Sequence, residues 1–112
     1  MAKNPMDLLH GTLDVLVLKS LARGPAHGYA VSRSIEDRTG GVFAVEDAAL
    51  YKALHRLEAT GAIESDWGVS ESNRRAKYYQ LTRRGRALLK TETDVWHRYA
   101  AAVLSVLKAA EA

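Results

Sequence analysis

Basic side chains gather in one short stretch of this 112-residue chain. Guanidinium and ammonium groups bind the phosphate oxygens of nucleic acids, and such contacts supply affinity without reading sequence. The stretch therefore favours a polyanionic partner, whereas the alternative is a solvated charged face that binds nothing. The basic residues lie between positions 74 and 86, with no acidic residue among them: Arg74, Arg75, Lys77, Arg83, Arg84 and Arg86.

A second group of polar side chains lies on a predicted helix at about 46–60. Leu50, Leu54 and Leu57 recur at i, i+4 and i+7, which is the spacing of an apolar helix face. The other face and its flanks are cationic and aromatic, with alanines short enough to let a partner come close. The side chains that can reach base edges or phosphates are Tyr51, Lys52, His55 and Arg56.

Three of the candidate contacts have plain structural alternatives. The Tyr51 ring could pack beside the leucine stripe instead of donating its hydroxyl to a phosphate. His55 could be an idle exposed side chain. Tyr29, which follows Gly28 at the start of a predicted helix, could bond a phosphate near the helix N-terminus or pack into the core. We expect Gly28 to leave the backbone accessible at that point.

Composition excludes several other kinds of site. The chain is 47% hydrophobic and 26% charged, which is typical of a globular protein, and its formal net charge is +3. It has no cysteine, so disulfides, thiolate catalysis and cysteine-based metal sites are excluded. The four histidines form no metal-binding motif, and no phosphate loop, nucleophile elbow or paired carboxylates appear. The sequence predicts no enzyme, no metal and no cofactor.

The N-terminal stretch fits neither a signal peptide nor a membrane span. It begins Met-Ala-Lys-Asn-Pro, and the apolar run that follows is broken by His10, Gly11 and Asp14. We therefore expect a cytoplasmic protein with no membrane contact.

The elements that must position these side chains follow from apolar spacing and from glycine and proline. Arg23-Gly24-Pro25 and Gly40-Gly41 end helices, Gly61 is a candidate left-handed C-cap, and alternation on both sides of a polar tip predicts a hairpin. Three helices followed by a hairpin form the winged helix-turn-helix layout, a mainly α (α+β) fold. The predicted elements are helices at about 7–22, 27–39, 46–60 and 82–110, a strand stub at 42–45 and the hairpin at 63–81.

Local capping and pairing can be predicted at the hairpin. Period-two alternation puts Ile63 and Trp67 on one face and Tyr79 and Leu81 on one side of the returning strand, with the tip at 68–73. Thr82 is a good N-cap whose hydroxyl can accept the Gly85 N–H. We divide the chain into a DNA-binding domain at 1–82 and a C-terminal helix at 83–112.

The last helix carries an apolar side too broad for a helix that only covers its own domain. At roughly 28 residues it is about 40 Å long, so its far half needs another surface, most simply a second copy of the chain. The alternative is a monomer in which the helix folds back. The expected dimer contacts are Leu89, Val95, Trp96, Tyr99, Val103, Val106 and Leu107.

Trp96 and Tyr99 lie one turn apart in the middle of that stripe. Two Trp96 rings near a dimer axis could frame a slot for a flat apolar molecule. The alternative is that both rings are dimer core.

With these residues in view, the chain resembles the PadR family of bacterial transcriptional regulators, in the short form with a single dimerising C-terminal helix. The similarity covers nearly the whole chain in the right order. It rests on Leu9-His10-Gly11-Thr12-Leu13, Gly24-Pro25-Ala26-His27-Gly28-Tyr29, Leu50-Tyr51-Lys52-Ala53-Leu54-His55-Arg56-Leu57-Glu58, Arg74-Arg75-Ala76-Lys77-Tyr78-Tyr79-Gln80-Leu81-Thr82, and Trp96.

The resemblance implies a homodimeric repressor on an inverted-repeat operator, with the third helix in the major groove and the wing on the backbone. It also implies release by an effector, since some short-form relatives bind planar hydrophobic compounds between their C-terminal helices, and Trp96 falls at that position. Ala49 stands where the family usually has a DNA-contacting threonine. Glu46, Ala48 and Lys52 also depart from the family pattern, and Lys52 restores a cation on the outward face. Glu46 and Asp47 would repel phosphate unless they serve as caps.

Two other classes of function compete with a DNA-binding repressor. A winged helix can be a protein-interaction module that never contacts DNA. A small-molecule carrier built around Trp96 and Tyr99 would need no regulation.

Overall fold

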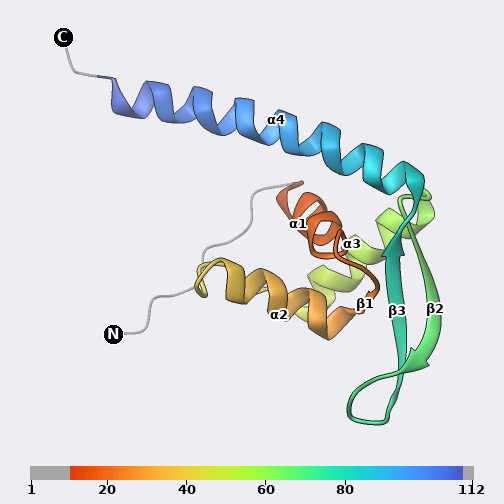
Figure 1. Ribbon diagram of the computed structural model, residues 1–112. Coiled ribbons are helices and arrows are strands. Elements are labelled where there is room, and N and C mark those ends of the chain that lie inside the picture. The colour runs from red at the N-terminus through yellow and green to blue at the C-terminus, as the bar shows by residue number, and fades with distance from the viewer. Residues whose placement is uncertain (1–10, 110–112) are drawn as a thin grey trace.

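Residues 11–109 are described by a computed structural model of the protein, and they form four helices and a small antiparallel sheet (Figure 1). The predicted fold class is confirmed. Residues 7–10 of the predicted first helix and Ala110 of the last lie outside the described residues. In chain order the elements are α1 (Thr12–Ser20), β1 (Ala26–His27), α2 (Gly28–Arg38), α3 (Asp47–Ala59), β2 (Ile63–Val69), β3 (Arg75–Leu81) and α4 (Arg83–Lys108).

The sheet has the order β1-β3-β2, and all its pairs are antiparallel. The predicted strand stub at 42–45 is wrong: that segment is a loop, and its Phe43 and Val45 pack on the core. The third strand is Ala26–His27, which pairs with β3. A two-residue strand just before a helix leaves no period-two pattern, so only the tertiary contact makes it a strand.

The hairpin of β2 and β3 forms the wing. Ile63 pairs with Leu81 and Ser65 with Tyr79, so the face predicted from alternation is confirmed. This face is buried at the wing base and becomes exposed toward the tip. The tip is shorter than predicted, because β2 continues to Val69.

The core lies between α1, α2, α3 and the base of the wing. The apolar stripe of α3 is confirmed, since Leu50, Leu54 and Leu57 are all buried. The core also contains Leu13, Val17, Leu18, Leu21, Val31, Ile35, Ala53, Ala62, Ile63, Tyr79 and Leu81. Gly61 ends α3 in the left-handed conformation, with φ of 81°.

A close junction joins the wing to α4. The Thr82 hydroxyl accepts the Gly85 N–H at 3.1 Å, as predicted, and it also donates toward the Gly61 and Ala62 carbonyls. Gly85 is buried against Ala62, and a Cβ atom there would lie 1.9 Å from the Ala62 carbonyl oxygen. The first turn of α4 is therefore fixed to the end of α3 and to the wing base.

Beyond this junction α4 leaves the body of the molecule. Leu88 and Leu89 pack against the core, and α4 contacts α1 over this first part. Residues 101–109 are all exposed, and Figure 1 shows the far half of α4 extending past the other helices. At 26 residues the helix is about 40 Å long.

Candidate nucleic-acid interface

The outer face of α3 is open to solvent. Lys52 and His55 are exposed, and Tyr51 keeps half of its surface. The N-terminal turn carries exposed Ala49 beside Asp47. Acidic groups there favour the positive end of the helix dipole and disfavour phosphate. The cationic part of this face therefore begins only at Lys52.

Glu46 occupies the N-cap position of α3. Its side chain makes no capping hydrogen bond. The Glu46 carboxylate therefore stays free to repel phosphate, and phosphate contact at this end of the helix is disfavoured.

Tyr51 is held against the start of α2. A Cβ atom on Gly28 would lie 2.8 Å from the Tyr51 hydroxyl oxygen and 3.1 Å from the ring carbon that carries it. The expectation that Gly28 leaves its backbone accessible is wrong, because the Tyr51 ring covers it and Gly28 is buried. The glycine is instead what lets the end of the Tyr51 ring approach α2 closely, with the hydroxyl beside the helix N-terminus.

Aromatic rings surround the start of α2. His27 caps the helix, its Nδ1 accepting the Ala30 N–H at 3.2 Å. Its ring stacks on Tyr29 at 6.5 Å between centroids and meets Tyr78 edge-on at 5.4 Å. Tyr29 is 68% exposed, which excludes core packing of its ring. The Tyr29 hydroxyl is thus available to a ligand.

Arg56 is not free on the α3 surface. Its guanidinium lies 2.7 Å from the Asp14 carboxylate of α1, and both side chains are partly exposed. The ion pair turns Arg56 toward α1 and lowers its value as a phosphate contact. The sequence prediction treated Arg56 like Lys52, because nothing in the α3 pattern reveals a partner 42 residues away.

The basic cluster divides into free and engaged side chains. Within residues 11–109, Arg74 and Arg75 make no salt bridge with an acidic side chain. Lys77 lies 3.9 Å from Glu58 of α3, and Arg84 donates to the Thr60 carbonyl at 2.8 Å. Arg83 and Arg86, both exposed on α4, likewise form no salt bridge within these residues. Arg74 and Arg75 are therefore the available cations on the wing, whereas Arg84 closes the end of α3.

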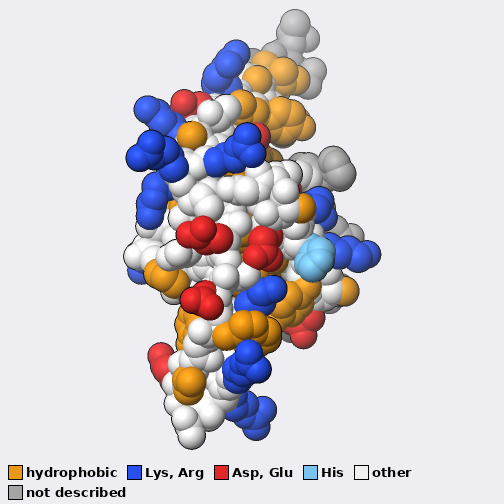
Figure 2. All heavy atoms as spheres, turned by 90° about the vertical axis from the view of Figure 1, so that its right-hand side faces the viewer, with side chains coloured by type: hydrophobic (Ala, Val, Ile, Leu, Met, Phe, Trp, Pro, Cys, Tyr) orange, Lys and Arg blue, Asp and Glu red, His pale blue; other side chains and the backbone are white. Residues whose placement is uncertain are grey.

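Trp67 is a functional candidate that the sequence analysis did not select. It is 56% exposed, and the Arg75 guanidinium lies over its ring at 4.4 Å. Figure 2 shows Lys and Arg side chains beside hydrophobic ones along the wing, at the lower end of the molecule. The sequence signal that could have identified Trp67 is the period-two alternation of the wing strands, which places Trp67 on one face of the hairpin. The strand register places it opposite Lys77 on that face.

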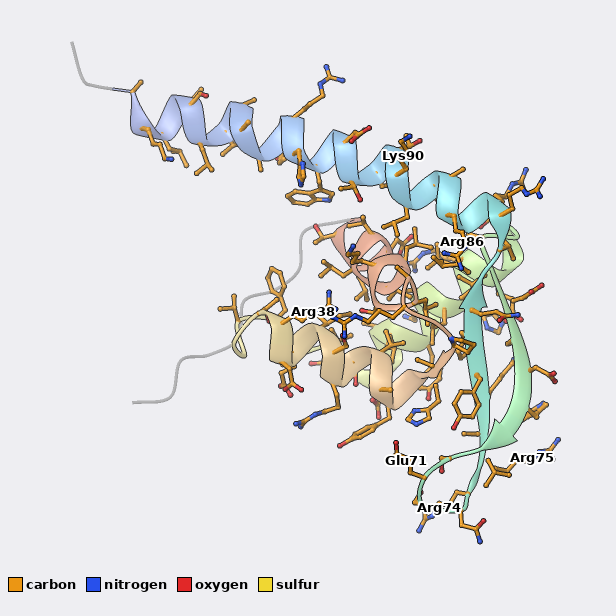
Figure 3. All side chains as sticks on the ribbon, viewed as in Figure 1. Arg38, Glu71, Arg74, Arg75, Arg86 and Lys90 are labelled. Carbon is orange, nitrogen blue, oxygen red and sulfur yellow. The ribbon has the colours of Figure 1, made fainter. Side chains whose placement is uncertain are left out.

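An open hollow of about 780 Å³ lies between the wing, the start of α2 and α3. Glu71 lies on the α2 side of the wing tip, and Arg74 and Arg75 project from the wing at the rim of the hollow (Figure 3). Three separate elements therefore present polar and aromatic groups to the same hollow. The lining includes His27, Gly28, Tyr29, Arg33, Tyr51, Trp67, Glu71, Arg74, Arg75, Lys77 and Tyr79.

Tyr79 joins the hollow to the core. Burial raises the pKa of its phenol, and the nearby Glu58 carboxylate adds to the rise. Glu58 also accepts the Ser65 hydroxyl of the wing. The Tyr79 hydroxyl is therefore neutral at physiological pH, and Glu58 links α3 to both wing strands.

The predicted dimer stripe stands exposed on α4. Val95, Tyr99 and Val103 are 40–55% exposed, and Val106 and Leu107 about three quarters. The Trp96 and Tyr99 rings meet edge-on at 5.6 Å between centroids. Leu89, by contrast, packs partly on the body of the same chain.

Comparison with known proteins identifies this arrangement. The sequence profile of the transcriptional regulator PadR-like family matches residues 17–91, which include α2, α3, the wing and the first part of α4. The chain belongs to the PadR-like family. The resemblance drawn from the sequence is confirmed, and a PadR-like chain is a DNA-binding transcriptional regulator.

Individual relatives agree with this PadR-like assignment. A PadR family transcriptional regulator from Eggerthella lenta is 35% identical with a TM-score of 0.75, covering 89% of this chain and 85% of its own. A transcriptional regulator from Clostridium thermocellum is 30% identical with a TM-score of 0.79, covering 88% and 92%. A protein of Lysinibacillus sphaericus, named uncharacterized protein X, is 32% identical over 90 residues, or 80% of this chain and 83% of the relative.

Neither a metal-binding cluster nor a membrane-spanning helix is found in the described part of the PadR-like chain. Residues 11–109 hold no cluster of three or more side chains suited to bind a metal ion. The same residues include no helix that is both long and apolar enough to span a membrane.

Proposed function

We propose that the protein is a homodimeric, cytoplasmic repressor that binds an inverted-repeat operator. The observation that carries this proposal is the hollow that α2, α3 and the wing share, with Lys52 on the helix that borders it. Arg74 and Arg75 at its rim have no acidic partner within residues 11–109. A convex duplex fits such a surface, with α3 in the major groove and the wing along the backbone.

The proposed contacts differ in what they do. Lys52 and His55, in the middle of the exposed face of α3, reach base edges. Tyr29 and Tyr51, beside the α2 N-terminus, bond one phosphate, because orphan backbone N–H groups there favour an anion. Arg74 and Arg75 neutralise phosphates. Lys77 and Arg56 add positive charge nearby, although each is paired with a carboxylate. Ala49 leaves space for the duplex to approach.

The apolar stripe of α4 supports the dimer. An inverted repeat requires two recognition helices related by a twofold axis. A pair of packed α4 helices would supply that axis. Val103, Val106 and Leu107 form an exposed apolar patch, and such patches on monomeric proteins usually mark an interaction site. We propose that a planar hydrophobic effector binds beside Trp96 and Tyr99 and releases the repressor from DNA.

The proposal is tested by selecting genomic fragments on the purified protein and measuring affinity for an enriched duplex. We expect Lys52→Ala and Arg75→Ala each to weaken binding, because both remove a cation that has no acidic partner within residues 11–109. The Arg75 change should also lower the slope of log K against log salt by about one.

Lys108→Ala on the distant end of α4 is the control and should leave both affinity and slope unchanged. Equal binding by all three variants and the parent would contradict the proposed interface. A protein that enriches no fragment at physiological salt would favour the interaction-module alternative.

A separate prediction concerns the Gly28–Tyr51 contact. Gly28→Ala should push the Tyr51 hydroxyl away from the α2 N-terminus, because the new methyl would lie 2.8 Å from it. We expect affinity for the selected duplex to fall about two- to tenfold, the worth of one hydrogen bond. The melting temperature should stay nearly constant, because the displaced atom is the end of an exposed side chain.

The matched control is the same change in a Tyr51→Phe background. Phenylalanine lacks the atom that comes closest to the methyl, so Gly28→Ala should then have a smaller effect on affinity. An equal loss in both backgrounds would show that Gly28 acts through something other than the Tyr51 hydroxyl.

A further inference from the structure

Trp67 and Arg75 form one exposed unit on the wing. In the strand register Trp67 lies opposite Lys77, so Arg75 is its diagonal neighbour on the same face. The Arg75 guanidinium stacks 4.4 Å from the ring centroid, whereas 56% of the Trp67 surface stays open. The open face of the ring and the cation beside it are therefore both accessible to a partner.

Within residues 11–109 no carboxylate, including that of Glu71 in the same hollow, forms a salt bridge with Arg75. Glu58 is engaged by Ser65 and Lys77, and Glu64 accepts from Gln80 on the opposite face of the wing. Contact with the ring restricts the Arg75 guanidinium, and none of its N–H groups donates a hydrogen bond to another described residue. A planar donor held in this way loses less conformational freedom on binding than a free side chain.

The strand ends that carry this unit are fixed by hydrogen bonds at the wing tip. The Ser70 N–H donates to the Arg74 carbonyl at 2.8 Å, and the Tyr78 hydroxyl donates to the Val69 carbonyl at 3.1 Å. Asn73 closes the turn with φ of 60°, a value that asparagine tolerates well. These contacts order the backbone from which Arg75 projects.

The unit faces the proposed ligand. Trp67 and Arg75 line the same hollow as Tyr51 and the start of α2, and Figure 3 shows Arg75 projecting from the wing. A phosphate requires only positive charge, which a flexible lysine supplies. A flat guanidinium backed by an apolar ring matches a narrower target, the minor groove, whose walls are sugars and whose potential is most negative where A·T pairs narrow it.

We propose that Trp67 and Arg75 together read the minor groove beside each α3 site and select A·T pairs there. This inference rests on the proposed function and adds to it, because the wing then contributes sequence preference and not backbone affinity alone. Arg75 enters the groove, and the Trp67 ring covers the sugars at its edge.

The test uses a duplex enriched by genomic selection on the wild-type protein. A·T pairs are replaced by G·C in blocks of three across the fragment. We expect one block on each side to lower affinity about tenfold, the cost of one disfavoured pair. Replacing guanine by inosine in those blocks removes the N2 amino group from the minor groove and keeps the major-groove pattern of G·C. We expect inosine to restore the affinity.

Variants assign the effect to the two residues. Arg75→Lys keeps the charge but not the plane, so it should lose the block dependence and keep the salt slope. Trp67→Ala should reduce the dependence and weaken binding about two- to fivefold, whereas Trp67→Phe should keep part of both, since it retains a ring. Lys77→Ala, on the same face, is the control and should weaken binding equally on all duplexes.

The inference is overturned if inosine fails to restore binding, or if Arg75→Lys and Trp67→Ala retain the full preference for A·T blocks. A duplex on which no block matters would also overturn it while leaving the proposed repressor intact. Failure of the wild-type protein to enrich any fragment contradicts the proposed function instead, so the two failures are distinguishable.

Discussion

Replacing Val103 and Leu107 with glutamate is expected to convert the protein to monomers. Both side chains are exposed on the α4 stripe, at 40% and 74%, and lie one turn apart. Four carboxylates buried against one another in a dimer would be strongly unfavourable. Loss of the twofold partner should lower affinity for an inverted-repeat duplex by at least about a hundredfold, because two linked half-site contacts become one.

The measurement is sedimentation together with duplex binding. The control is Ala101→Glu with Ser105→Glu, which adds the same charge at the same spacing on the opposite side of α4, where both residues are also exposed. We expect this control to remain dimeric and to bind DNA. A dimer that survives the Val103 and Leu107 changes would refute the proposed interface and favour another use of the stripe.

Gly85→Ala is expected to have the largest effect on stability. The new Cβ atom would lie 1.9 Å from the Ala62 carbonyl oxygen, which is backbone and already accepts from the Thr82 N–H at 3.1 Å. Alanine favours a helix by about 1 kcal/mol over glycine. The clash should outweigh that gain and cost roughly 3 kcal/mol net.

Thermal melting followed by circular dichroism measures this cost. A loss of that size should lower the melting temperature by roughly 10–20 °C at fixed protein concentration. Arg86→Ala, an exposed change at the next position of α4, should melt like the parent. A Gly85→Ala protein that also melts like the parent would mean that α4 does not approach Ala62 so closely.

Most of the fold could be predicted because its signals are local. The leucine stripe of α3, the Thr82 cap and the pairing face of the wing depend on residues within a few positions of one another, and all three are confirmed. The strand β1 could not be predicted, because two residues before a helix become a strand only when β3 offers them a free edge.

The site was harder to predict because its contacts join distant parts of the chain. Lys52 and Arg56 look alike on α3, but only Arg56 meets a carboxylate from α1. The sequence predicts an accessible backbone at Gly28, because it does not show that the Tyr51 ring covers this position. Trp67 reads as an ordinary strand residue until Arg75 stacks on its ring.

The ion pair between Arg56 and Asp14 links two functions of the chain. The helix α1 packs against α4 and is bonded through Asp14 to α3. In the proposed dimer, α1 offers a route by which a change in how two α4 helices cross would reach α3. The spacing between the two recognition helices would then follow the angle at the dimer axis. The angle between the two α4 helices would then set both the operator spacing that the dimer accepts and its response to an effector.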